Sequence, residues 1–118
     1  MIRSLVIFSF ILAASVANAQ EYKKMDSEYM LHSGSIGDPV PASKNDAKVS
    51  LAIKGKAAES IFFQIGPDVK DACSSESGSR FRNKGGNGVS CQYNKPDGYT
   101  CYIGIDLKRG KLVNSSVC

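Results

Sequence analysis

The chain has 118 residues, with 15 Lys and Arg, 11 Asp and Glu, one His and four Cys. This length suits one domain, and the apolar (42%) and charged (22%) contents exclude a polytopic membrane protein and a wholly disordered chain. The single histidine excludes His-rich metal centres and every site that needs two imidazoles.

The first 19 residues have the features of a secretory signal peptide. Arg3 places a positive charge near the start, an apolar run extends from Leu5 to Val16, and Ala17-Asn18-Ala19 is a small-x-small cleavage site. An apolar run of about 12 residues is too short to span a membrane, which takes about 20. We therefore expect residues 1–19 to be removed, Gln20 to begin the mature chain, and the protein to be secreted or periplasmic.

Residues 20–46 are predicted to be an N-terminal arm and a flexible loop. The spacing of Tyr22, Met25 and Tyr29 suits one face of a helix, but an extended arm packed by its aromatic side chains is an equal alternative for residues 20–32. Residues 33–46 hold two Gly and two Pro, which is typical of a loop. No acidic residue adjoins His32 in the sequence, so we interpret it as an ordinary exposed histidine rather than the base of a Ser–His–Asp site.

Residues 47–118 are predicted to form an α+β domain. Its first element is a strand over residues 48–54, in which apolar and polar side chains alternate. The period then changes to that of an amphipathic helix over residues 56–65. Gly66 and Pro67 end this helix, because Gly suits a left-handed cap and Pro cannot continue the hydrogen-bond ladder.

Turn signals divide the rest of the chain into short strands. Consecutive hairpins predict a small antiparallel β-meander of about four strands. We expect the helix to cover one face of this sheet, in a two-layer α+β fold. The predicted strands are 80–84, 89–94, 99–106 and 111–118, and the turns between them are 85–88, 95–98 and 108–110.

Four cysteines, Cys73, Cys91, Cys101 and Cys118, predict two disulfide bonds in an exported protein. Their wide spacing lacks the close pairs of a zinc site, and we expect neither a metal nor a cofactor. If Pro96–Gly98 is a three-residue hairpin loop, Cys91 and Cys101 lie diagonally, too far apart for a bridge. A shift of the loop by one residue places them opposite each other. Two pairings therefore remain open: Cys91–Cys101 with Cys73–Cys118, or Cys73–Cys91 with Cys101–Cys118.

Basic residues are concentrated in the C-terminal part of the chain. Residues 20–79 hold seven basic and nine acidic side chains, a net charge of −2, whereas residues 80–118 hold seven basic and two acidic ones, a net charge of +5. This asymmetry predicts a weak anion-binding or partner-binding surface. Cations on an edge strand also prevent unwanted strand pairing, which is the structural alternative. The predicted surface consists of Arg80, Arg82 and Lys84 on one face of a strand, extended by Lys108, Arg109 and Lys111.

Four aspartates are the candidates for carboxylate catalysis, and each also has a structural interpretation. We interpret Asp68 and Asp71 as loop residues after the helix, Asp97 as a turn residue, and Asp106 as part of a surface ion pair on the polar face of its strand. We therefore predict a small, non-catalytic protein of the bacterial periplasm or exterior. It is expected to bind an envelope component (anionic lipid, lipopolysaccharide or cell-wall polymer) or another protein, as an inhibitor, adaptor or stress factor, and not to bind nucleic acid. The alternative is a small exported hydrolase that uses surface carboxylates.

Overall fold

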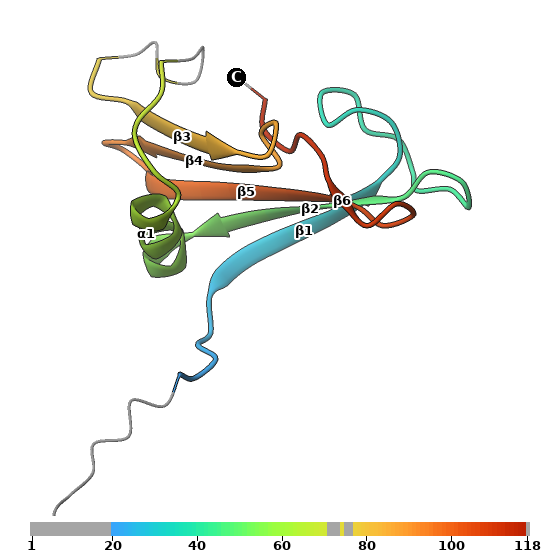
Figure 1. Ribbon diagram of the computed structural model, residues 1–118, viewed down its shortest axis with the longest axis horizontal. Helices are drawn as coiled ribbons and strands as arrows, with labels where there is room; N and C mark the ends of the chain where they lie inside the picture. The colour runs from blue at the N-terminus through green and yellow to red at the C-terminus, as the bar shows by residue number, and fades with distance from the viewer. Residues whose placement is uncertain (1–19, 71–73, 75–76, 118) are drawn as a thin grey trace, which may run out of the picture.

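The computed structural model describes residues 20–70, 74 and 77–117; the predicted signal peptide, Asp71, Cys73 and Cys118 lie outside them. Within the described residues, six strands form one antiparallel sheet and one helix packs on it, which confirms the predicted α+β fold (Figure 1). The strand order is β1-β2-β5-β4-β3, with β6 beside β5. The elements are β1 (Asp26–His32), β2 (Lys48–Lys54), α1 (Gly55–Gln64), β3 (Arg80–Lys84), β4 (Val89–Asn94), β5 (Gly98–Asp106) and β6 (Lys111–Leu112).

β1 settles the alternatives for residues 20–32 in favour of a strand. It pairs with β2 along its whole length, from Asp26 opposite Lys54 to His32 opposite Lys48. Its first six residues are exposed, so the strand lacks the alternation that marks a half-buried strand. The sheet therefore has more strands than the predicted meander.

α1 follows β2 directly and covers one end of the sheet (Figure 1). It begins one residue earlier than predicted, at Gly55, whose positive φ of 67° allows the abrupt change from strand to helix. Ala58 and Phe62 are its buried side chains, and both belong to the core. The buried core consists of Ile53, Ala58, Phe62, Cys91 and Cys101, with Leu51, Ala57, Ile61, Ile65, Tyr93, Tyr99 and Ile103 packed against it.

The two faces of the sheet are covered differently. Residues opposite each other in the register share a face, so Ile53, Cys101 and Cys91 all lie on the face that α1 covers, which we call the helix face. The opposite face carries Gly104 and is crossed by the C-terminal segment 113–117; we call it the tail face.

The predicted strand over residues 111–118 is wrong, because β6 ends at Leu112. The chain then passes over Gly104: the N–H of Val113 donates to the carbonyl of Gly104 at 3.0 Å. A Cβ on Gly104 would overlap the carbonyl oxygen of Val113 and approach the Cβ of Ser115 within 2.8 Å. The missing side chain at Gly104 is therefore what lets this segment cross the sheet instead of extending it.

The β4–β5 hairpin decides the disulfide pairing. Asn94 pairs with Gly98, so the loop consists of residues 95–97 and lies one residue earlier than the loop at Pro96–Gly98. Cys91 consequently lies opposite Cys101, and the two form a disulfide bond. This confirms one member of the first pairing and excludes the alternative in which Cys91 and Cys101 bond to other cysteines.

Candidate functional site

Two arginines of β3 share one carboxylate beside α1. Arg80 Nε lies 2.8 Å and Arg82 Nε 2.7 Å from the oxygens of Asp68. Both guanidinium groups also stack on the Phe62 ring, with Cζ 5.0 Å (Arg80) and 4.3 Å (Arg82) from its centroid. Hydrogen bonds from Arg80, and then from Arg82, hold the pKa of Asp68 below its ordinary value. The cluster fixes the loop after α1 to the edge of the sheet.

These ion pairs reduce the positive charge that the predicted anion-binding surface can offer to an anion. The alternation in β3 does place Arg80, Arg82 and Lys84 on one face, as expected. The arginines, however, already neutralise part of their charge on Asp68, and Arg109 does so on Asp106. Anion binding stays a prediction, and it depends mainly on the members that form no ion pair within the described residues: Lys84, Lys108 and Lys111.

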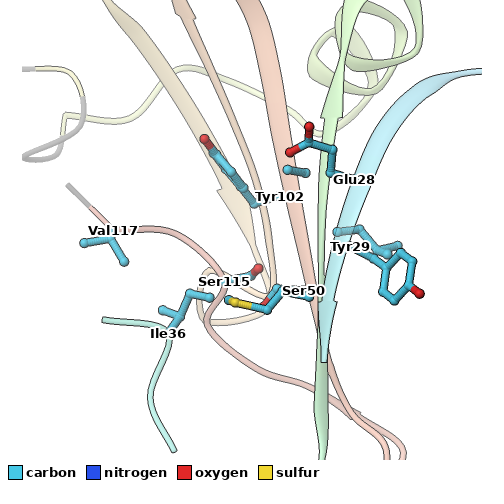
Figure 2. A pocket seen from close by; sticks show the side chains of 10 residues that line it. Glu28, Tyr29, Ile36, Ser50, Tyr102, Ser115 and Val117 are labelled. Atoms are coloured by element: carbon cyan, nitrogen blue, oxygen red, sulfur yellow. The ribbon is translucent and has the colours of Figure 1, made fainter. Parts of the chain in front are cut away.

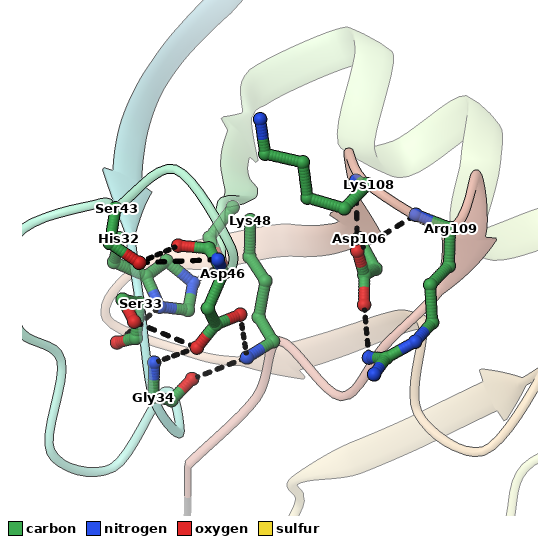
Figure 3. Close-up of polar contacts among 10 residues, drawn as sticks. His32, Ser33, Gly34, Ser43, Asp46, Lys48, Asp106, Lys108 and Arg109 are labelled. Carbon is green, nitrogen blue, oxygen red and sulfur yellow. Dashed lines mark hydrogen bonds and ion pairs between the residues drawn. The ribbon is translucent and has the colours of Figure 1, made fainter.

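Asp106 forms the predicted ion pair with a basic neighbour, Arg109, but the prediction that Asp106 lies at the surface is wrong. The residue is only 3% exposed, and its carboxylate accepts hydrogen bonds from the backbone N–H groups of Lys108 (3.0 Å) and Arg109 (3.1 Å) and from Arg109 Nη1 (3.0 Å) (Figure 3). Burial alone would raise the pKa of Asp106. The hydrogen bonds from Arg109 and Lys108 together lower this pKa by more than burial raises it, so the net pKa lies below its ordinary value. Asp106 therefore closes the turn before β6 and stays charged.

The interpretation of His32 as an exposed residue is also wrong. His32 is 1% exposed, its Nε2 lies 3.1 Å from Ser50 Oγ, and its Nδ1 lies 3.4 Å from the carbonyl oxygen of Ser33. A Ser–His contact is the arrangement that activates a serine, but here the third group is a backbone carbonyl rather than a carboxylate. The sequence analysis missed this pair because the two residues are 18 positions apart and meet only through the register of β1 and β2.

Asp46 ties the loop between β1 and β2 to the sheet, another role that the sequence analysis missed. Its carboxylate accepts hydrogen bonds from Ser33 Oγ (2.7 Å), the Gly34 N–H (2.8 Å) and Lys48 Nζ (2.9 Å) (Figure 3). The Gly34 N–H, then Lys48 and Ser33, hold the pKa of Asp46 far below its ordinary value. Residues 33–46 are thus an anchored loop, with an ion pair at its base.

We expect the protein to lose stability in acid, because Asp46, Asp68 and Asp106 all have a lowered pKa in the folded state. Their stabilisation is fully present above the unfolded value of about 3.9 and is lost as the pH falls toward the lower folded values. Urea unfolding at pH 7, 5, 4 and 3 measures this loss. Asp46→Asn should be less stable at pH 7 and less sensitive to acid, whereas the exposed Asp26→Asn serves as the control. Equal acid sensitivity of Asp46→Asn and the unmodified protein would contradict this expectation.

Beyond α1, the helix face presents a surface of apolar side chains, which we call the open apolar surface. Two rows cross the strands here, one through Tyr29, Leu51 and Ile103 and one through Leu31, Val49, Ile105 and Leu112. Leu51 and Ile103 touch the core, but the second row lies beyond the residues that pack against it. Tyr29, Leu31 and Leu112 are 73%, 53% and 48% exposed. A contiguous apolar patch of this kind is typical of an interaction surface.

A pocket of about 260 Å³ opens on the tail face, between the sheet and the segments that cover it (Figure 2). Met30, Ser50 and Tyr102 contribute from the strands, and Ile36 and Val117 from the covering segments. The hydroxyl of Ser115 is buried in its wall and has no hydrogen-bond partner among the described residues. The pocket is small and largely apolar, and Glu28 is the one carboxylate among the described residues that line it.

The described residues form neither a metal site nor a membrane-spanning helix. No three His, Cys, Asp or Glu side chains there gather as metal ligands, and no helix there has the length and apolar character to cross a membrane. Comparison with protein-family models, curated proteins and solved structures finds no match. The function is therefore inferred from the geometry of the described residues.

Proposed function

We propose that this is an exported, non-catalytic binding protein that recognises another protein through the open apolar surface. The observation that carries the proposal is that, beyond α1, apolar side chains of β1 and β6 are exposed and those of β2 and β5 between them are only half-buried. Export agrees with the Cys91–Cys101 disulfide, since such bonds persist in oxidising compartments.

A protein partner fits this surface better than an anionic lipid. The row through Tyr29, Leu51 and Ile103 continues through Val89 to Lys84, so its far end carries one basic side chain without an ion pair among the described residues. Arg80, Arg82 and Arg109 are held by Asp68 and Asp106. Electrostatic attraction to a membrane needs several free cations close to the apolar contact. A flat apolar sheet face instead packs well on a second layer of polypeptide, at a distance of about 10 Å.

The carboxylates favour binding over hydrolysis. A glycosidase-type general acid needs a raised pKa and a free position beside the substrate. Asp68 and Asp106 have a lowered pKa and hold guanidinium groups. Their contacts give both residues a structural role.

The test is capture of envelope proteins by the immobilised mature chain, with the affinity of each captured partner then measured in purified form. Leu31→Ser should weaken partner binding about tenfold or more, the equivalent of one buried Leu side chain. Met30→Ser is the matched control, because Met30 is the adjacent residue of β1, is 38% exposed, and lies on the tail face.

Equal affinities of the two variants would contradict the open apolar surface as the binding site. Binding to anionic vesicles that disappears as salt rises, with no protein captured, would instead favour the predicted lysine-based anion surface.

A further inference from the structure

The outer edge of β1 is unpaired over the middle of the strand. The other edge strand, β3, is partly covered, because the Val69 N–H donates to the carbonyl of Phe81 at 2.8 Å. On β1, Ser33 exchanges two hydrogen bonds with Val40, at 2.8 and 3.1 Å, just past the end of the strand. Among the described residues, nothing else hydrogen-bonds to this edge, so residues 27–31 present a template for another strand.

Gly104 shows which backbone groups of β1 point outward. Its N–H donates to Gly88 (2.9 Å) and its carbonyl accepts from Val113 (3.0 Å), so the even-numbered residues of β5 bond away from β2. Successive residues of an antiparallel strand bond to alternate sides. Through the register of β5, β2 and β1, the even-numbered residues of β1 bond to β2 and the odd-numbered ones point outward. The outward-pointing residues are Ser27, Tyr29 and Leu31, and Ser33 continues the series.

We propose that β1 pairs with β1 of a second copy of this chain, antiparallel about a two-fold axis at Tyr29. A two-fold axis perpendicular to the sheet makes an edge strand antiparallel to its own copy. Tyr29 then lies opposite Tyr29 of the other copy and Ser27 lies opposite Leu31, with about six backbone hydrogen bonds between the strands. Val40 limits the pairing at both ends, and Figure 1 shows the chain before β1 leading away from the sheet.

Charge selects this position of the axis over its neighbours. An axis at Glu28 would place the Glu28 residues of the two copies opposite each other, and an axis at Asp26 would do the same for Asp26. An axis at Ser27 would place Asp26 of one copy opposite Glu28 of the other. Like charges directly opposite each other destabilise a strand pair. With the axis at Tyr29, Glu28 instead faces Met30 and Asp26 faces His32. An axis at Met30 would place Ser27 opposite Ser33, whose outer side Val40 occupies.

The pairing makes one surface out of two. Tyr29 and Leu31 lie on the helix face, so the open apolar surfaces of the two copies become continuous across the axis. A contact over so short an edge is smaller than the roughly 1,200 Å² of a stable interface, so we expect a reversible dimer. The inference goes beyond the proposed function and does not depend on it, because it concerns the protein alone.

Sedimentation equilibrium of the purified protein, from about 1 μM to about 1 mM, tests the pairing. The unmodified protein should show a monomer–dimer equilibrium. Tyr29→Glu and Tyr29→Lys should each be at least tenfold weaker in dimerisation, because each substitution places two like charges opposite each other at the axis. A 1:1 mixture of the two variants should restore the dimer, because the opposite charges then face each other.

Two controls separate edge pairing from other contacts. Leu112→Ser alters the open apolar surface on β6, away from β1, and should leave the dimer unchanged. Hydrogen exchange of the unmodified protein should show that the amides of Ser27, Tyr29 and Leu31 become protected as concentration rises, while that of Glu28 does not change. A protein that stays monomeric, a variant mixture that does not recover, or a dimer lost in Leu112→Ser would overturn the proposal.

Discussion

Phe62→Ala should lower the free energy of unfolding by about 3–5 kcal/mol, the usual cost of removing a buried aromatic ring. Phe62 is fully buried and touches the rings of Phe63 and Tyr99, with centroids 5.5 and 5.1 Å away. It is also the surface on which both arginines of β3 stack, so the substitution removes a core contact and loosens the ion-pair cluster together. Urea unfolding followed by circular dichroism measures the loss.

Phe63→Ala is the matched control for this prediction. Phe63 is the next residue of α1 and also aromatic, but its side chain is 53% exposed, so its removal should cost about 1 kcal/mol or less. An equal loss in both variants would show that the effect comes from the helix as a whole rather than from the buried ring. A normal unfolding curve for Phe62→Ala would contradict its central place in the core.

Removal of the Cys91–Cys101 disulfide should cost roughly 3 kcal/mol, the chain-entropy value for a closed loop of this length. The two residues are 10 positions apart and both are fully buried between the sheet and α1. The double variant Cys91→Ala with Cys101→Ala should therefore unfold at a clearly lower urea concentration than the unmodified protein. A denaturant midpoint unchanged by the double substitution would contradict a stabilising role for this bond.

The same variant tests the second predicted bond. Thiol titration of the denatured, unreduced variant should find no free thiol if Cys73 and Cys118 are joined, as we predict. Two thiols per chain would show that the Cys91–Cys101 bond is the only one in the protein.

Local patterns predicted the central elements well. The change from a period of two to a helical period fixed β2 and α1 to within a residue, because one side of each is buried against the same core. β1 carries no such pattern, since an edge strand with six exposed residues does not need alternating hydrophobicity. Its identity depends on pairing with β2, which no local property of residues 26–32 expresses.

The polar contacts were harder to predict than the strands. Alternation in β3 correctly placed Arg80 and Arg82 on one face, but their partner Asp68 lies in a loop 12 to 14 residues earlier. The sequence analysis predicted His32 and Asp106 to be exposed because polar residues usually are. Each is buried by partners that the register or a turn supplies: Ser50 for His32, and the backbone of the following turn for Asp106.

The strand order has a kinetic consequence. The β3–β4 and β4–β5 hairpins close loops of only a few residues, whereas β2 must find β5 across the 46 positions from Lys54 to Thr100. Short-range contacts cost less chain entropy to form, so the three-stranded unit β3–β4–β5 should form early. β1, whose one partner among the described strands is β2, should join last. Destabilising substitutions in the β4–β5 hairpin should therefore slow folding, whereas those in β1 should mainly speed unfolding.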